Sequence, residues 1–156
     1  MNATLSKIKW GLIAPTIKQI GLYSDTALNL VTGTGLVESG YRVTSQIGCG
    51  PALGWFQMEP ATHDDCWWNF LRYRPELARA VSALCHDEEP SASLLQSNPA
   101  YAAAMCRVKY LRSPLPLPKN TAFNLCQYWK QVYNTPLGKG QVDAQHISLF
   151  QEAIDA

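Results

Sequence analysis

The stretch GLVESGYRVTSQIGCGPALGWFQMEPAT, residues 35–62, joins two segments with helical character through a long irregular loop. It opens on the last turn of an apolar segment that ends near Glu38. A run rich in Gly, Ser and Cys follows, and Pro60 occupies a favoured first position for the next helix. Loops of this length inside a compact chain are often functional. We therefore expect the loop to form one wall of a cleft that contains the Glu38 side chain.

The segments on either side of this stretch show helical rather than strand periodicity. Ser24 or Asp25 can cap a helix that presents Leu28 and Val31 inward and ends near Glu38. Two glycines in that helix, Gly33 and Gly35, predict the close approach of another backbone. Further helices are expected at residues 15–22, 60–73, 75–85, 99–111, 121–133 and 143–154.

Turn and cap residues separate these segments. Asn98-Pro99, Thr121 and Asp143 each stand where a helix N-cap is expected, and three prolines enforce an extended link over residues 114–118. No segment alternates with period two, so we predict an all-α chain, or a mainly α chain with a very short strand pair within residues 41–53. The 156 residues are expected to form a single domain spanning residues 1–156.

Composition narrows the class of function. A formal net charge of +1 disfavours a nucleic-acid partner, which usually selects a strong basic surplus. No apolar run is long enough to span a bilayer, so stable membrane insertion is not expected. Five widely spaced cysteines predict reduced, mostly buried thiols and synthesis in a reducing cytoplasm. The early apolar run is interrupted by Pro15, which argues against a signal peptide.

Glu38 is the candidate catalytic residue. A helix C-terminus carries partial negative charge, and burial disfavours the ionised form, so both effects raise the pKa of a carboxyl group there. A carboxylic acid that stays protonated near neutral pH suits a general acid, such as the one that glycoside cleavage requires. An ordinary solvated glutamate near a helix end is the structural alternative.

A second carboxylate is less certain from the sequence. Asp64 and Asp65 are expected in the first turn after Pro60, where acidic residues favour a helix N-terminus, so a structural role suffices for them. Glu59 lies beside the expected cleft wall. If no second carboxylate takes part, an N-acetyl group of the substrate can assist, as in substrate-assisted glycosidases.

Three polar residues complete the candidate site. The Gln57 amide is suited to a sugar hydroxyl or amide group, or alternatively ties the loop together. Tyr133 and Asn134 close a predicted helix, where Asn is also a common stop signal. Ser39 has no evident histidine base, which excludes serine-hydrolase chemistry, and the three histidines form no triad. We expect no metal and no cofactor.

The order of these motifs resembles the catalytic segment of soluble lytic transglycosylases and goose-type lysozymes, which have a lysozyme-like fold. That family shows Glu-Ser at a helix end, present as Glu38-Ser39, and a Gly-Leu-Met-Gln-x-x-Pro-x-Thr motif, here GWFQMEPAT at 54–62. A late Ala-Tyr-Asn-Ala-Gly motif corresponds to VYNTP at 132–136, without its glycine. A helix opening on Asn-Pro and reaching Tyr-Leu spans 98–111, and the resemblance covers residues 25–140.

The resemblance implies a peptidoglycan-cleaving enzyme. Glu38 would be the single acid/base that protonates the oxygen between N-acetylmuramic acid and N-acetylglucosamine, leaving a 1,6-anhydro end. Gln57, Glu59, Tyr133 and Asn134 would contact the glycan strand, and Ser39 would help to orient Glu38. Because Glu59 stands where the family is often apolar, a muramidase that adds water is the alternative, and a non-catalytic virion or wall-binding protein is another.

The same resemblance suggests a biological setting. A monomeric bacteriophage endolysin or a virion-associated enzyme is expected, made in the host cytoplasm without a signal peptide and acting on the cell wall. This expectation is an analogy of context rather than a deduction from a site.

Overall fold

The structure is a computed structural model that describes residues 3–42, 50–134 and 138–156. The described chain is mainly helical, as predicted, and its β pairing consists of one isolated bridge between Leu53 and Met58. Most of the loop expected to carry a strand pair, residues 43–49, lies outside the described residues. The elements in chain order are α1 (Ala3–Ile8), η1 (Lys9–Ile13), α2 (Ala14–Gln19), α3 (Asp25–Glu38), α4 (Pro60–Asn69), η2 (Leu71–Tyr73), α5 (Pro75–Ala83), α6 (Leu94–Ser97), α7 (Pro99–Arg112), α8 (Ala122–Tyr128), η3 (Trp129–Asn134) and α9 (Ala144–Asp155).

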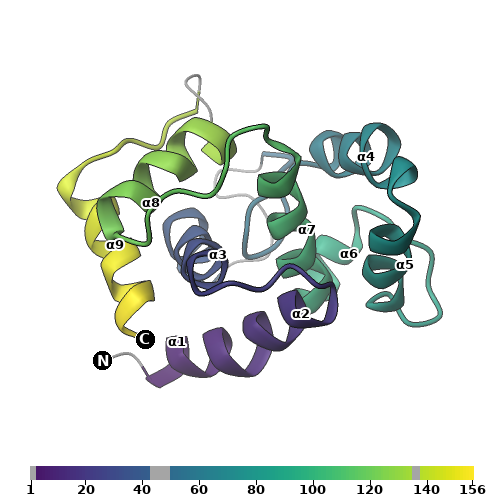
Figure 1. Cartoon of the computed structure of the whole chain (residues 1–156), viewed down its shortest axis with the longest axis horizontal. Helices are drawn as coiled ribbons and strands as arrows, with labels where there is room; N and C mark the ends of the chain where they lie inside the picture. The colour runs from purple at the N-terminus through teal and green to yellow at the C-terminus, as the bar shows by residue number, and fades with distance from the viewer. Residues whose placement is uncertain (1–2, 43–49, 135–137) are drawn as a thin grey trace.

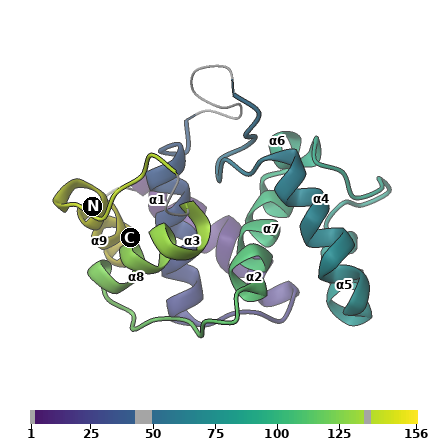
Figure 2. The ribbon, with the colours of Figure 1, turned by 90° about the horizontal axis from the view of Figure 1, so that it is seen from above.

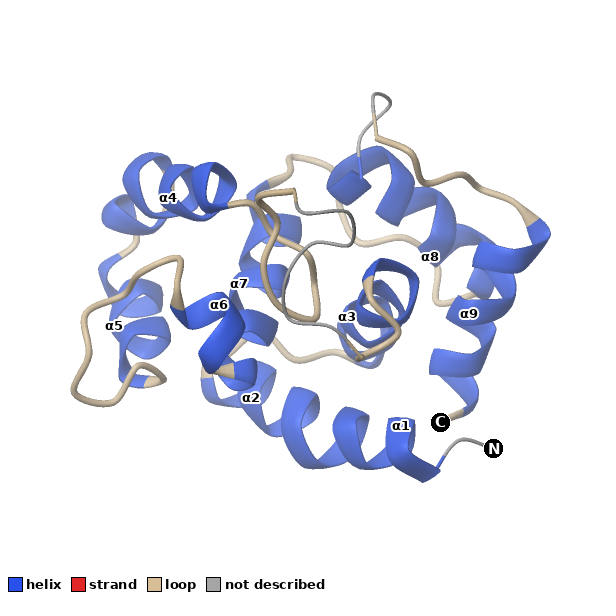
Figure 3. Cartoon of the chain, turned by 180° about the vertical axis from the view of Figure 1, so that it is seen from behind, coloured by secondary structure: helices blue, strands red, loops and turns tan. Residues whose placement is uncertain are grey.

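Helix α3 is the centre of the packing (Figures 1 and 3). Every residue from 27 to 35 is buried, and α9, α8, α7 and η1 all contact the helix. A helix enclosed on all sides has no single apolar stripe, and the buried residues of α3 include the polar Asn29, Thr32 and Thr34. The position of Glu38 at the end of this enclosed helix fixes the carboxylate in space, because the helix that carries it has little room to shift.

The two glycines of α3 admit aromatic side chains, not the backbone that the sequence pattern predicts. A Cβ at Gly33 would lie 2.3 Å from the Phe150 ring, and one at Gly35 would lie 2.1 Å from the Tyr41 ring. The Tyr41 hydroxyl passes over the helix and donates to the Thr32 carbonyl at 2.7 Å. A flat ring needs the same absence of a Cβ as a crossing chain does, so the sequence alone does not separate the two cases.

The amino-terminal helix is longer than predicted. Residues 3–19 are helical throughout, whereas the sequence predicts a lead-in up to a helix start at Pro15. The π-helical turn η1 ends at Ile13, two residues before Pro15, which has no N–H to donate to the previous turn. A π-turn relaxes the tight i→i−4 ladder at such a point, so the helix continues through the proline.

The predicted N-caps are confirmed. Each side chain accepts a hydrogen bond from the backbone N–H three residues later: Ser24 from Ala27, Asn98 from Tyr101, Thr121 from Asn124, and Asp143 from His146. Each bond satisfies one of the N–H groups that a helix start leaves without a partner. The caps therefore set the starts of α3, α7, α8 and α9.

Helices α4, α5 and α6 lie on one side of α7, and α3, α8 and α9 lie on the other (Figure 2). The described cysteines, Cys66, Cys85, Cys106 and Cys126, are free and buried, as expected, while Cys49 lies outside the described residues. None of the described helices has the length and hydropathy needed to cross a bilayer.

Candidate active site

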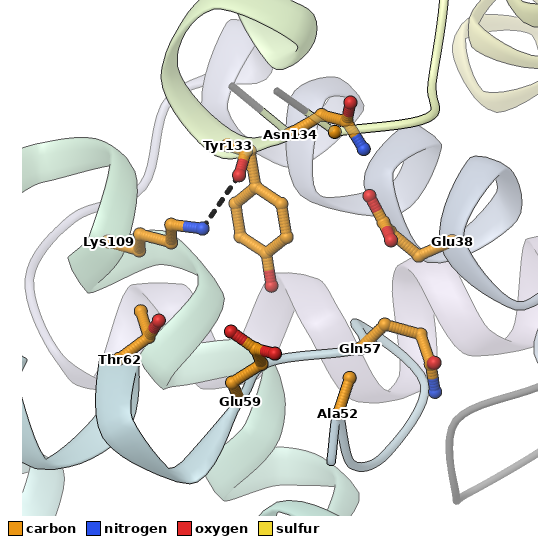
Figure 4. A pocket seen from close by; sticks show the side chains of 9 residues that line it. Glu38, Ala52, Gln57, Glu59, Thr62, Lys109, Tyr133 and Asn134 are labelled. Atoms are coloured by element: carbon orange, nitrogen blue, oxygen red, sulfur yellow. Dashed lines mark hydrogen bonds between the residues drawn. The ribbon is translucent and has the colours of Figure 1, made fainter. Parts of the chain in front are cut away.

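Glu38 is the last residue of α3, and its side chain is half-buried. The Trp129 indole Nε1 donates a hydrogen bond of 2.9 Å to its Oε2 atom. The amide nitrogen of Asn134 also points toward the carboxylate (Figure 4), and its interaction with the carboxyl group lowers the pKa of Glu38. Trp129 and Asn134 are the first and last residues of η3, so one wide helical turn supplies both contacts.

The surroundings of Glu38 raise its pKa above the usual value. Burial is the largest cause, because it removes water from the ionised form. The hydrogen bond from Trp129, the positive charge of Lys109 and the nearby Asn134 amide oppose this effect but do not cancel it. The net direction is the one expected from the sequence. A raised pKa keeps Glu38 protonated and able to donate its proton. The Trp129 N–H, already in place, then stabilises the carboxylate that remains.

Glu38 faces a cleft with a volume of about 330 Å³. Its walls come from the end of α3, the 52–59 loop, the start of α4, the last turn of α7, and η3 (Figure 4). The lining residues are Glu38, Ala52, Gln57, Glu59, Thr62, Lys109, Tyr133, Asn134 and Gly138. Five of the six residues singled out from the sequence therefore meet in one cavity.

Tyr133 forms the middle of the cleft. Its ring lies between Lys109 and Glu38 in Figure 4, and the Lys109 ammonium is 3.9 Å from the ring centroid. The buried hydroxyl donates to the Phe56 carbonyl at 2.7 Å. This bond ties η3 to the 52–59 loop, so Tyr133 holds the two cleft walls together.

The 52–59 loop has a constrained backbone. The Leu53–Met58 bridge closes it, and the Gln57 Nε2 atom donates to the Gly54 carbonyl at 2.9 Å. Gln57 has a φ of 48°, in the left-handed region that most residues avoid. The loop-tying alternative for Gln57 is thus present, and the residue also lines the cleft.

Glu59 is the second carboxylate of the cleft. It is the exposed N-cap residue of α4 and points toward the cavity (Figure 4). Asp64 and Asp65 are engaged elsewhere: Asp64 accepts from His63 at 2.9 Å, and Asp65 pairs with Arg112. Both aspartates have structural partners, but the structure places neither in the first turn of α4, so the predicted role at the helix N-terminus is wrong.

Ser39 serves the backbone around the site. Its hydroxyl lies 2.7 Å from the Trp55 carbonyl and 3.3 Å from the Gly35 carbonyl, and its oxygen accepts from the Tyr41 N–H at 3.0 Å. These bonds fasten the end of α3 to the 52–59 loop. Any orientation of Glu38 by Ser39 thus acts through the main chain.

Two residues of the site were not predicted from the sequence. The sequence pattern indicates Trp129 only as a core residue, but its spacing of four from Tyr133 on one helix places both on one face. Lys109 was not singled out, although a lysine directly between Val108 and Tyr110 in a helix interior is a detectable signal. Its ammonium donates to the Tyr133 carbonyl at 2.7 Å.

Two further expectations from the sequence concern the third motif and a metal site. Thr135 and Pro136, part of the third motif, lie outside the described residues. Within residues 3–42, 50–134 and 138–156, no three His, Cys, Asp or Glu side chains are grouped so as to hold a metal ion.

Comparison with known proteins returns no match among family models, curated proteins or solved structures. The residues of the cleft are therefore the basis for a functional proposal.

Proposed function

We propose that this protein cleaves peptidoglycan glycan strands as a lytic transglycosylase, with Glu38 as the single acid/base. The observation that carries the proposal is the environment of Glu38: a half-buried carboxyl group with a raised pKa, held by Trp129 and facing a cleft. A general acid needs these properties, and an ordinary helix-end glutamate has neither the cleft nor the donors.

In the proposed reaction, Glu38 donates its proton to the glycosidic oxygen between N-acetylmuramic acid and N-acetylglucosamine, and the C1–O bond breaks. The acetamido oxygen of the muramoyl residue bonds to C1 as the leaving group departs. The C6 hydroxyl of the same sugar then attacks C1 and releases the acetamido oxygen. Glu38 takes the hydroxyl proton, which gives a 1,6-anhydro ring and restores the acid.

The two hydrogen-bond donors from η3 fit this cycle. After the first step Glu38 is a carboxylate, and the Trp129 N–H and the Asn134 amide stabilise that anion. Because both donors are present before reaction, no rearrangement is needed as charge develops. The donors thereby limit how far burial raises the pKa, so that Glu38 can serve both as acid and as base.

Glu59 supports a second candidate function. It is exposed at the opposite wall of the same cleft, where it could activate a water molecule in a hydrolytic muramidase reaction. A water-using reaction leaves reducing muramic ends, whereas the transglycosylase reaction leaves anhydro ends.

Mass spectrometry of digested, purified peptidoglycan tests the proposal. Anhydro-muramic ends are expected from the wild-type protein, and reducing ends would instead support the muramidase. Glu38→Gln keeps the shape of the side chain and an oxygen that accepts from Trp129, but it cannot donate an acidic proton. Unchanged wall cleavage by this variant would falsify the role of Glu38, and absence of cleavage by the folded wild-type protein would favour a binding function.

A further inference from the structure

The cleft does not end at the residues around Glu38. Thr62 and Lys109 also line a second, open hollow of about 360 Å³, bordered by α4, the end of α7 and η3. Its other walls include Asp65, Arg112 and Gln131. Because the two hollows share Thr62 and Lys109, Lys109 stands at the junction between the site of bond cleavage and an adjoining space.

Lys109 is the single cation among the described residues that line the cleft. The nearby Arg112 is paired with Asp65, and Lys130 donates to the Asn134 side chain and to the Gly138 carbonyl, both at 2.9 Å. The Lys109 ammonium, by contrast, makes one hydrogen bond among the described residues, to the Tyr133 carbonyl at 2.7 Å. An ammonium group has three N–H donors, so donors remain for a ligand in the cleft.

We propose that Lys109 binds a carboxylate of the substrate at this junction, the carboxylate of the lactyl group on a muramoyl residue. This inference deepens and rests on the proposed function. It makes Lys109 a specificity-determining residue that separates acid-bearing glycans from neutral polymers of N-acetylglucosamine.

The charges of the cleft support this placement. Glu59 repels an anionic ligand at its own wall, whereas Lys109, on α7, attracts one toward the second hollow. The ammonium is half-buried, so its attraction for a carboxylate is screened less than that of a surface lysine. The contact of Lys109 with Tyr133 fixes the ammonium in place, which lowers the entropic cost of binding.

The inference is tested by binding rather than by cleavage. In a Glu38→Gln background, isothermal calorimetry compares a tetrasaccharide of alternating N-acetylglucosamine and N-acetylmuramic acid with the same oligosaccharide whose lactyl carboxylates are methylamides. Lys109→Met is expected to weaken binding of the carboxylate form by about tenfold, as for the loss of a charge-assisted hydrogen bond. It should change binding of the amide form by less than about twofold, because no charged contact is lost there.

Two further variants act as controls. Lys109→Arg, which keeps the charge, should retain most of the preference for the carboxylate form. Lys119→Met removes an exposed lysine from the Pro-rich link, away from the residues of the cleft, and should leave both affinities unchanged.

Equal losses for both ligands in Lys109→Met would show that Lys109 only supports Tyr133, and would overturn the inference. So would equal affinity of the unsubstituted protein for the two ligands while wall cleavage remains intact, which would leave the proposed function standing. Absence of binding to either oligosaccharide, together with absence of wall cleavage by the wild-type protein, would overturn both.

Discussion

The two walls of the cleft each carry a glutamate, but they place it in opposite surroundings. Glu38 ends the enclosed helix α3, is half-buried, and receives a hydrogen bond from Trp129 of η3. Glu59 precedes α4 and is exposed. The same chemical group is thus prepared as an acid on one wall and left in water on the other. The contrast supports the proposed catalytic role of Glu38, because its environment, and not its residue type, distinguishes it from Glu59.

Replacement of each glutamate is the strongest test of this contrast. We expect Glu38→Gln to lower the rate of peptidoglycan cleavage by about 10³-fold, the usual scale for loss of a general acid. Glu59→Gln should retain activity within about tenfold if the substrate's acetamido group replaces a second carboxylate. Turbidity loss of a purified wall suspension measures both rates, and circular dichroism checks folding. A larger loss from Glu59→Gln than from Glu38→Gln would reverse the assignment.

The wall formed by the 52–59 loop can be tested by a substitution that strains its backbone. Gly54 has a φ of +77°, and a Cβ there would lie 2.0 Å from the Leu95 carbonyl oxygen. We expect Gly54→Ala to lower the free energy of unfolding by more than about 2 kcal/mol, since backbone strain and a clash with main chain combine. Urea denaturation measures the loss.

Gly11 offers a matched control for that variant. It lies in η1, and a Cβ added there would meet no described neighbour within 4 Å, so Gly11→Ala should be neutral or stabilising by up to about 1 kcal/mol. Equal stability of the two variants would show that the loop wall is less constrained than its geometry indicates.

The surroundings of Glu38 can be tested by replacing Trp129. Trp129→Phe removes the N–H that donates to Glu38, and this bond favours the ionised form. Its loss should therefore raise the pKa of Glu38 further and move the alkaline limb of the pH–rate profile to higher pH. The smaller ring should also cost about 1–3 kcal/mol of stability in the core. A limb that moves to lower pH would contradict this account of Glu38.

The smallest expected effect concerns stability as a function of pH. Because the folded protein raises the pKa of Glu38 above its usual 4.5, the folded state binds more protons than the unfolded state in the interval above that value. The contribution of Glu38 to stability therefore falls as pH rises from 4.5 to the folded pKa, and is constant above it.

Thermal denaturation of Glu38→Gln and wild-type protein across this interval checks the sign. The glutamine variant should be relatively more stable at about pH 7 than at about pH 4, because it has no charge to bury. A relative gain in stability for Glu38→Gln at about pH 4, compared with about pH 7, would contradict a raised Glu38 pKa.

The sequence by itself determined the features that depend on neighbouring residues. Helix periodicity predicted the all-α chain, and the short polar side chains of Ser24, Asn98, Thr121 and Asp143 marked helix starts, because a cap bonds an N–H only three residues away. The end of α3 at Glu38 and the burial of that end were likewise predicted from local pattern.

Only the tertiary structure decided which distant side chains meet. The bond from Trp129 to Glu38 spans 91 residues, and the contacts of Phe150 with Gly33 and of Lys109 with Tyr133 also join separate elements. No local propensity encodes such pairs, because they follow from how whole helices pack around α3. The sequence therefore placed the acid at a helix end, while packing supplied the donors, the cation and the cleft.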